Sequence, residues 1–348
     1  MSESKTILII GAGGFIGGFI AREALNRGYQ VWVAVRESTS RRYLDDPRLN
    51  FVVLDYDNSD LMGTTLRNAA PTPAGRWDYM IWNLGATKCT NFADFNRINY
   101  LYLRNFIEVM EEENLVPDRF LYMSSLSALG LGDEVAYTPF DSRSIPAPNT
   151  RYGLSKIKSE TYLESHGNIP WIIFRPTGVY GPHEKDYLMM IKSIDSGWDF
   201  GVGFKRQMLT FIYVDDLVRA MFDALAAGVV KKKYIISEPR AYTQSEFRKI
   251  VADALGRRFV VPVRLPMWAV YCASVVAEKW GVLTLKPSTL NRDKFKIMKQ
   301  RNWCCDVSDA ERDFGFTVEY PLERGIAETV KAYKADKEQR KNNKKAGK

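Results

Sequence analysis

Residues 9–25 read IIGAGGFIGGFIAREAL and place Gly11, Gly14 and Gly17 where an apolar run passes into a helix-like one. Glycines at this spacing serve three needs: a tight turn, close approach of the backbone to a pyrophosphate, and close packing of the helix on the strand. The N–H groups at the start of the helix then face the bound anion. This stretch predicts a βαβ unit that binds a dinucleotide, and an ordinary glycine-rich turn is the alternative.

The chain that follows this turn alternates between two kinds of segment. Short apolar runs, typical of parallel strands buried on both faces, lie at 6–12, 30–35, 50–56, 79–86, 119–125 and 170–176. Helical stretches lie between them, including 15–27, 94–112 and 152–165. This alternation predicts an α/β fold, a Rossmann-type doubly wound parallel sheet.

The second half of the chain is less regular. Helices are expected within 182–200 and 208–225, and at 243–256, 266–281 and 322–335. Thr243 and Glu246 have the spacing of a capping box. These helices predict a smaller, mostly helical C-terminal substrate lobe at the carboxyl edge of the sheet, where ligands of open α/β sheets bind. We expect a Rossmann domain of residues 5–178 plus 208–237, a substrate-binding lobe of 179–207 plus 238–333, and a basic disordered tail of 334–348.

The formal net charge of +8 is concentrated near the C-terminus. Residues 331–348 hold eight lysines and arginines against Asp336 and Glu338, which leaves +2 for the rest of the chain. A basic end with few apolar residues is typical of a solvated tail. We therefore expect no nucleic-acid partner.

Composition and cysteine usage indicate a cytoplasmic protein. The N-terminal MSESKTILII leads directly into a strand-like run, without the pattern of a signal peptide. The apolar stretch MWAVYCASVVA (267–277) is shorter than the roughly 20 residues that span a bilayer, so we expect no stable membrane insertion. The four cysteines show no CxxC spacing, and with only two histidines the chain predicts neither a metal site nor a histidine-centred triad.

The end of the second expected strand carries Arg36, where an NAD-binding unit places an acidic residue. An arginine can pair with a 2′-phosphate, and Arg41 and Arg42 lie nearby, so NADP(H) is favoured. Glu37 leaves NAD(H) as an alternative. Asp55 is positioned either to reach the adenine side or to cap a helix.

A further pattern joins a strand end to a helix. The strand at 119–125 ends in SSLS, and the later stretch TRYGLSKIKSET (150–161) places Tyr152 four residues before Lys156. Together with the glycine turn, these motifs resemble the extended short-chain dehydrogenases/reductases, which include nucleotide-sugar epimerases, dihydroflavonol reductases and 3β-hydroxysteroid dehydrogenases. The motifs that carry the resemblance, in the family's order, are GAGGFIG (11–17), WNLGA (82–86), RINYLYLRNF (97–106), SSLSALG (124–130), YGLSK (152–156), RPTGVYGP (175–182) and FIYVDDLVRA (211–220).

The resemblance implies hydride transfer with a Ser-Tyr-Lys set. Tyr152 would exchange a proton with the reacting oxygen, and Lys156 would lower the pKa of this phenol and hold the nicotinamide ribose. Ser125 would stabilise the substrate oxygen. It stands five residues before Gly130, as in the family, but Ser124 and Ser127 are alternatives. The implied cofactor-binding residues are Gly11, Gly13, Gly14, Phe15, Ile16, Gly17, Arg36, Asp55, Tyr56, Leu84, Gly85, Ala86, Asn99, Tyr152, Lys156, Pro176 and Val179.

Departures from the family pattern bear on the substrate. Nucleotide-sugar enzymes usually carry an asparagine where this chain has Gly178, and often Arg-Asp where it has Leu209-Thr210. Family dehydratases place Asp-Glu where Leu126-Ser127 follow the catalytic hydroxyl. The segments 265–280 and 303–330 are similar to the endings of 3β-hydroxysteroid dehydrogenase-like and dihydroflavonol reductase-like members.

These departures predict an NADP(H)-dependent oxidoreductase that interconverts an alcohol and a ketone on a fairly apolar small molecule. The alternatives are a nucleotide-sugar epimerase or dehydratase with tightly bound NAD and, outside enzymes, a cofactor-sensing or structural subunit. The apolar helix at 266–277 could line the substrate site, form the core of the lobe, or touch a membrane surface. Helices 94–112 and 152–165 could form a homodimer contact, as in many family members.

Overall fold

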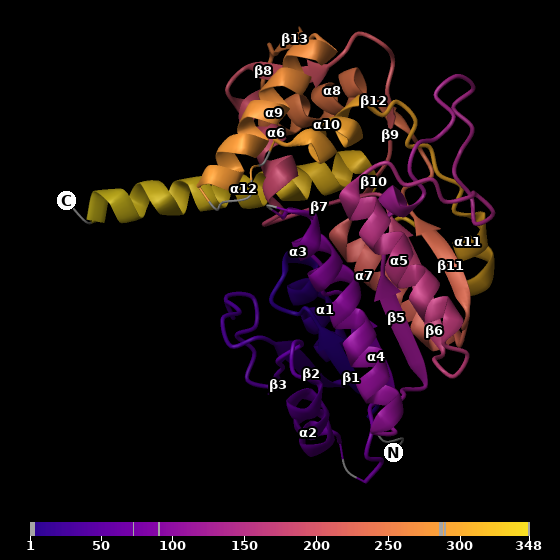
Figure 1. Cartoon of the computed structure of the whole chain (residues 1–348). Coiled ribbons are helices and arrows are strands. Elements are labelled where there is room, and N and C mark those ends of the chain that lie inside the picture. Colours follow the sequence, from indigo (N-terminus) through magenta and orange to yellow (C-terminus); the bar gives the residue numbers. More distant parts are fainter. Residues whose placement is uncertain (1–3, 72, 90, 285–287, 289, 347–348) are drawn as a thin grey trace.

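A seven-stranded parallel sheet forms the centre of the computed structural model, which describes residues 4–346 except 72, 90, 285–287 and 289 (Figure 1). The strand order is β11-β6-β5-β4-β1-β2-β3, so the direction of winding reverses between β1 and β4. The strands are β1 (Thr6–Ile10), β2 (Gln30–Val35), β3 (Leu49–Val53), β4 (Tyr79–Trp82), β5 (Arg119–Met123), β6 (Trp171–Pro176) and β11 (Lys232–Ile236). The predicted doubly wound Rossmann fold is confirmed.

The apolar strands are buried because helices cover both faces of the sheet. Ile7 and Ile9 of β1 pack in one core with α1 (Phe15–Asn26) and α7 (Val214–Ala227). Leu8 and Ile10 point to the other face, where α2 (Ser59–Ala69), α4 (Tyr102–Glu112) and α5 (Arg151–Ser165) form a second core. Each such side chain contributes about 1.5–3 kcal/mol on burial, which explains why these strands tolerate few polar residues.

A smaller lobe rests on the carboxyl edge of the sheet (Figure 1). It begins directly after β6, since β7 (Gly178–Tyr180) pairs with β10 (Phe211–Tyr213). Two further small sheets pair β8 (Trp198–Val202) with β13 (Val261–Leu265) and β9 (Met208–Leu209) with β12 (Tyr242–Thr243). The helices of the lobe are α6 (Lys185–Asp195), α8 (Gln244–Leu255), α9 (Met267–Leu283), α10 (Arg292–Lys299) and α12 (Leu322–Ala346).

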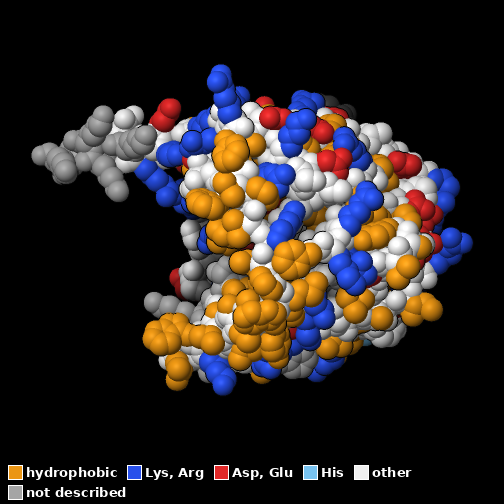
Figure 2. All heavy atoms as spheres, turned by 90° about the horizontal axis from the view of Figure 1, so that it is seen from above, with side chains coloured by type: hydrophobic (Ala, Val, Ile, Leu, Met, Phe, Trp, Pro, Cys, Tyr) orange, Lys and Arg blue, Asp and Glu red, His pale blue; other side chains and the backbone are white. Residues whose placement is uncertain are grey.

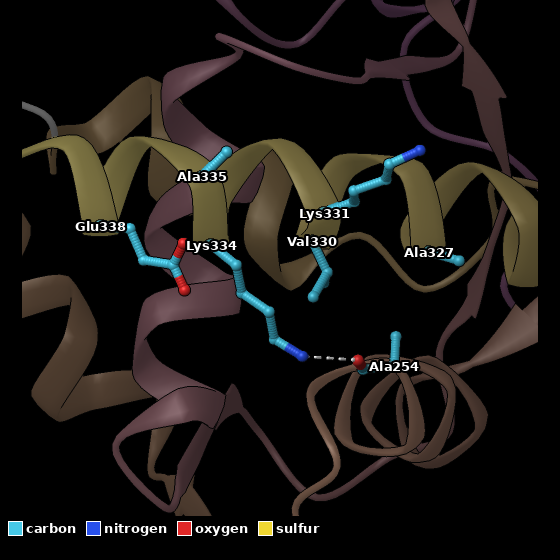
Figure 3. A pocket seen from close by; sticks show the side chains of 7 residues that line it. All are labelled: Ala254, Ala327, Val330, Lys331, Lys334, Ala335 and Glu338. Atoms are coloured by element: carbon cyan, nitrogen blue, oxygen red, sulfur yellow. Dashed lines mark hydrogen bonds between the residues drawn. The ribbon is translucent and has the colours of Figure 1, made fainter.

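The ends of α8 follow from its sequence. Thr243 and Glu246 form the predicted capping box. At the other end, Lys334 of α12 donates to the carbonyl oxygens of Ala254 (3.3 Å) and Leu255 (3.4 Å), across a shallow hollow between the two helices (Figure 3). A cation suits the carboxyl end of a helix, where carbonyl groups lack partners. This hollow therefore serves helix packing and lies apart from the predicted catalytic residues.

The terminal helix is longer than expected. α12 continues to Ala346, so residues 334–346, predicted as a disordered tail, are helical. Ten of its thirteen residues are lysine, alanine, glutamate, glutamine or arginine, which have high helix propensity. Lys337 also pairs with Asp195 of α6 at 2.7 Å. These contacts make the first turns of the basic segment part of the lobe.

Two other elements differ from the sequence expectations. The helix expected at 94–112 divides into α3 (Phe92–Asn96), a π-helical turn (Arg97–Leu101) and α4. α11 (Ser308–Phe314), assigned above to the substrate lobe, packs on the Rossmann core through Ala310, with Phe314 stacked on Phe174 at 5.9 Å. No helix formed by the described residues has the length and apolarity needed to cross a membrane.

Candidate functional site

The glycine turn between β1 and α1 brings backbone segments into close contact. Gly11 has a φ of +82°, and a Cβ there would lie 2.6 Å from the backbone nitrogen of Leu84. A Cβ on Gly17 would collide with the carbonyl oxygen of Gly11. Within the described residues no side chain caps the start of α1, whose N-cap is Gly14. The turn therefore presents unused N–H groups beside a close backbone contact, which fits a pyrophosphate.

The neighbouring residues of the turn have separate positions. Gly13 contacts the side chain of Thr39, and Phe15 packs edge-on against Phe19 at 5.6 Å. Ile16 follows Phe15 in the first turn of α1 and packs on the core that this helix shares with the sheet. These side chains anchor the helix start, so a contact with cofactor would come from their backbone.

Arg36 lies exposed at the end of β2, and its backbone N–H donates to Thr39 Oγ1 at 3.0 Å. Among the described residues its guanidinium has no carboxylate partner. Arg41 stacks on the ring of Phe51 at 4.4 Å, and Arg42 lies 5.6 Å from the ring of Tyr43. This edge of the sheet is therefore cationic and can accept a 2′-phosphate.

Asp55 follows β3, exposed, and its carboxylate accepts the N–H of Asp57 at 3.0 Å. It does not cap α2, because Asn58 does so by accepting from the N–H of Leu61. The Tyr56 ring is buried against Tyr102, with 5.3 Å between the ring centroids. Of these two candidates, Asp55 thus has a side chain that can reach a ligand.

The loop after β4 is held from below by Asn99, which is fully buried in the π-helical turn. Its side-chain oxygen accepts the N–H of Ala86 (2.7 Å), while its Nδ2 donates to the carbonyl of Ala86 (3.1 Å) and to Ser155 Oγ (2.8 Å). π-helical turns are frequent at functional sites because they re-aim a side chain. Asn99 thereby ties the loop Leu84–Gly85–Ala86 to α5.

Tyr152 and Lys156 stand one turn apart on α5, whose N-cap Thr150 accepts from the N–H of Gly153. Lys156 is buried, and its Nζ donates to the carbonyl of Met123 at 2.7 Å, 6.0 Å from the centre of the Tyr152 ring. A Cβ on Gly85 would lie 3.1 Å from this Nζ. The ammonium therefore sits between α5 and the loop after β4.

The two adjacent serines at the end of β5 differ in their partners. The Ser124 hydroxyl is buried and donates to Glu160. Ser125 accepts the N–H of Ser127 at 3.2 Å, and its hydroxyl is near enough to Tyr152 to lower the pKa of this phenol. The structure thus brings Ser125, Tyr152 and Lys156 together and turns Ser124 away from them.

Burial shifts the pKa values of both Tyr152 and Lys156. Burial raises the pKa of Tyr152 to about 12, and nearby Ser125 opposes this rise. Burial lowers the pKa of Lys156 to about 8, and nearby Glu160 opposes this. Desolvation of the phenolate therefore outweighs the effect of a lysine 6.0 Å from the ring centre. In the protein without ligand, Tyr152 is a neutral phenol, ready to donate a proton.

Sequence reasoning missed a buried ion pair beneath the site. Glu160, one turn beyond Lys156, pairs with Arg175 of β6 at 2.6 Å, and neither side chain is more than 2% exposed. The pair also receives the Ser124 hydroxyl. The spacing of Tyr152, Lys156 and Glu160 by four residues each was the available signal, because it places all three on one face of α5.

Pro176 is the buried last residue of β6, and Val179 lies in β7. Between them, a Cβ on Gly178 would collide with the Tyr187 hydroxyl from α6. Tyr187 therefore occupies the space into which a side chain at position 178 would extend. No cluster of histidine, cysteine, aspartate or glutamate able to hold a metal ion occurs among the described residues.

Comparison with known proteins agrees with this geometry. The model of the NAD dependent epimerase/dehydratase family matches residues 7–237. Short-chain dehydrogenase/reductase family 42E member 1 of Homo sapiens is 35% identical over 297 residues, covering 80% of this chain and 74% of that protein. UDP-glucose 4-epimerase of Vibrio cholerae is 24% identical over 341 residues (94% and 95%), and ceramide reductase of Caulobacter vibrioides 23% over 331 residues (94% of each).

A solved structure extends the comparison to the fold. DesIV, the dTDP-glucose 4,6-dehydratase of Streptomyces venezuelae with NAD and TYD bound, has a TM-score of 0.76 at 20% identity. The alignment covers 96% of this chain and 98% of that one. The likeness therefore includes both the sheet and the lobe.

Proposed function

Because this chain belongs to the NAD-dependent epimerase/dehydratase family of extended short-chain dehydrogenases/reductases, we propose that it is an NADP(H)-dependent oxidoreductase that interconverts an alcohol and a ketone on a fairly apolar small molecule. Membership of this family establishes that the protein is an NAD(P)-dependent enzyme. The preference for NADP(H), the class of substrate and the roles of individual residues are the proposal.

The observation that carries the proposal is a neutral Tyr152 one helical turn before the buried Lys156, with Ser125 near enough to lower the pKa of the phenol. A phenol held protonated by its burial can give its proton to a carbonyl oxygen as that oxygen gains negative charge. Ser125 can donate to the same oxygen and orient it. Lys156 supplies positive charge close to the phenol and offsets the charge that forms when the proton leaves.

The residues that would hold the cofactor form two groups. The turn at Gly11–Gly17 would bind its pyrophosphate through backbone N–H groups, and Arg36 would pair with the 2′-phosphate. Lys156, beside Gly85, would bind the nicotinamide ribose. When bound, the nicotinamide supplies or accepts the hydride.

The substrate side supports an apolar molecule over a nucleotide sugar. Tyr187 fills the space beside Gly178, where nucleotide-sugar enzymes usually project an asparagine. Where nucleotide-sugar enzymes often have Arg-Asp, this chain has Leu209-Thr210. Thr210 is buried, and its carbonyl accepts a hydrogen bond from Thr177 Oγ1 at 2.6 Å. The relative named ceramide reductase acts, by its name, on a lipid and aligns along 94% of the chain. The similar alignment of UDP-glucose 4-epimerase keeps the sugar-nucleotide reaction as the second candidate.

The first experiment is a calorimetric titration of the purified protein with NADPH and with NADH, after a check for carried-over nucleotide. We expect weak, exchangeable binding that favours NADPH, followed by turnover of ketones or sterol-like alcohols in a screen. Tightly retained NAD, together with turnover of UDP- or dTDP-sugars alone, would overturn the proposal in favour of an epimerase or dehydratase. Binding of cofactor with no turnover of either class would favour a sensing subunit.

Arg36→Glu tests the cofactor preference. An acidic residue at the end of β2 accepts hydrogen bonds from the ribose 2′-hydroxyl and repels a 2′-phosphate, so the ratio of NADPH to NADH affinity should fall by roughly tenfold or more. Arg48→Glu is the matched control, since Arg48 is also exposed and pairs only locally with Asp46. An unchanged ratio in Arg36→Glu would show that this arginine does not read the 2′-phosphate.

A further inference from the structure

The exposed aromatic side chains of this protein gather in one part of the fold. Among the described residues, seven aromatic side chains are exposed, and all of them lie between residues 198 and 280. They are Trp198, Phe200, Phe204, Phe259, Trp268, Tyr271 and Trp280. Soluble monomers rarely expose contiguous apolar surface of this kind without an interaction. Figure 2 shows hydrophobic side chains massed on the face of the molecule seen from above the lobe.

α9 lies at the centre of this surface. Unlike an ordinary surface helix, it exposes its large apolar side chains and buries its small ones. Trp268 and Trp280 are 72% and 68% exposed, and Val276 and Leu283 share their outward arc, whereas the partly exposed Tyr271 packs edge-on against Phe295 of α10 at 5.5 Å. The inward side carries small or short side chains, the buried Val270, Ser274 and Gly281. The helix thus turns its bulkiest apolar groups away from the core, so core packing does not explain them.

The edge of the β8–β13 sheet continues this surface. Trp198 and Phe200 stack with ring centroids 6.4 Å apart on β8. The N–H of Gly203 donates to the carbonyl of Leu265 (2.9 Å), and a Cβ on Gly203 would meet Met267, the first residue of α9. The exposed Phe204 follows directly. We call the exposed apolar residues of this region the aromatic face. They are Trp198 and Phe200 of β8, Phe204, Leu265 of β13, and Met267, Trp268, Tyr271, Val276, Trp280 and Leu283 of α9.

The segments that carry the aromatic face hold more basic than acidic residues. Segments 198–206 and 256–284 hold six basic residues: Lys205, Arg206, Arg257, Arg258, Arg264 and Lys279. Their two acidic residues are Asp199, buried and paired with Arg248 at 3.3 Å, and Glu278, paired with Arg292 at 2.9 Å. Only Arg257 of the six has a carboxylate partner among the described residues, namely Asp195. The segments with the exposed aromatic groups therefore also carry five cations that have no carboxylate partner among the described residues, of which Arg264 bonds to Gln244.

From this combination we propose that the aromatic face docks the enzyme on an anionic membrane surface, with α9 lying in the plane of the headgroups. Tryptophan and tyrosine favour the membrane interface, where one part of the ring is apolar and the other hydrated. The cations complement acidic headgroups, and α9 spans about 25 Å along that plane. A second copy of the chain is a poorer occupant, because a two-fold contact would set this cationic surface against itself.

The test measures partition of the full-length protein onto vesicles by flotation. Vesicles of an equal mixture of phosphatidylcholine and phosphatidylglycerol should bind the protein at low salt, and phosphatidylcholine alone should bind it at least tenfold less. Added salt should weaken binding, because it screens the headgroup charge. Brominated phosphatidylcholine in the anionic vesicles should quench tryptophan fluorescence.

Two variants separate the aromatic and charge contributions. Trp268→Gln/Trp280→Gln should lose at least tenfold in partition, and Lys205→Glu/Arg258→Glu should lose its preference for anionic vesicles. Val135→Gln/Ile145→Gln is the matched control, since both side chains are 87% exposed but lie elsewhere in the chain. Circular dichroism and cofactor titration check that each variant is folded.

The proposal is overturned if the wild-type protein stays unbound at low salt, or binds equally to neutral vesicles. Equal losses in the control and the tryptophan variant would also overturn it. A dimer in solution that the tryptophan variant dissociates, without vesicle binding by the wild type, would assign the face to a second copy instead. None of these outcomes depends on which substrate the enzyme turns over.

Discussion

Tyr152 is a phenol whose proton is strongly retained, since burial raises its pKa to about 12. Tyr152→Phe removes the proton while keeping the ring, so cofactor affinity should remain and kcat should fall by about 10²–10⁴-fold. Tyr162→Phe on the same helix is the control, because its hydroxyl bonds only to the surface Glu108 at 3.2 Å. Full turnover by Tyr152→Phe would mean that another group exchanges the proton.

Lys156 places a charge where burial disfavours it, so this residue should serve activity at the expense of stability. Its pKa is lowered to about 8 in the folded protein, against 10.5 for an ordinary lysine. This difference corresponds to a destabilisation of the folded protein by about 3 kcal/mol at neutral pH. Lys156→Met should therefore lose most turnover, while its free energy of unfolding at about pH 7 equals or exceeds that of the wild type.

The pH dependence of this difference has a definite sign. Between about pH 8 and 10.5 the unfolded chain binds the Lys156 proton more tightly than the folded one, so this group's contribution to wild-type stability improves as pH rises. The advantage of Lys156→Met should shrink over that window. Urea unfolding at several pH values measures it, and a variant that is clearly less stable than the wild type at neutral pH would contradict the burial cost.

At the scale of elements, the π-helical turn before α4 is the least regular helix segment near the site and carries Asn99. Asn99→Ala would leave the backbone groups of Ala86 without their partner, and the Ser155 hydroxyl would keep only its bond to the carbonyl of Tyr152. We expect a loss of at least about 2 kcal/mol in unfolding free energy, because buried groups left unpaired keep their desolvation cost. Cofactor affinity should also fall, by roughly tenfold, as the 84–86 loop loosens.

If Asn99 had a purely structural role, Asn99→Ala would lower the free energy of unfolding and leave the cofactor affinity unchanged. Ser159→Ala is the control for this, because the buried Ser159 hydroxyl donates to the carbonyl of Asn99 at 2.8 Å without touching the loop. It should be destabilised but bind cofactor normally. Parallel losses of affinity in both variants would assign Asn99 to general packing.

The elements also show what the sequence could predict and what it could not. The strand–turn–helix at Gly11 and the capping box of α8 depend on neighbouring residues, so local chemistry was sufficient. The π-helical turn interrupts an apolar pattern that continues from 94 to 112, and only the tertiary bonds of Asn99 reveal it. The Glu160–Arg175 pair joins a helix to a strand, and the Tyr187 contact at Gly178 joins a helix to a strand edge. Such contacts require the assembled fold.

For the whole molecule, the site depends on how the lobe sits over the sheet, and one carboxylate joins three segments across that boundary. The Asp186 carboxylate of α6 accepts hydrogen bonds from two lysines. One is from Lys88 Nζ (2.5 Å) in the loop after β4, and the other is from Lys294 Nζ (3.0 Å) in α10. Burial tends to raise the pKa of Asp186, but Lys294 and Lys88 more than offset this and hold it below 3.8. The carboxylate is therefore ionised at any pH at which the enzyme would work.

Asp186→Asn should loosen the lobe without touching the catalytic residues, so KM should rise several-fold while kcat changes little. The stabilising contribution of an aspartate with a lowered pKa is present above its unfolded value near 3.8 and is lost as pH falls through the folded value. The difference in Tm between wild type and Asp186→Asn should thus be constant near neutral pH and vanish in acid. Asp46→Asn, which breaks only a local pair with Arg48, should leave KM unchanged. An unaltered KM in Asp186→Asn, or a loss confined to kcat, would show that this three-way contact does not position the lobe over the substrate.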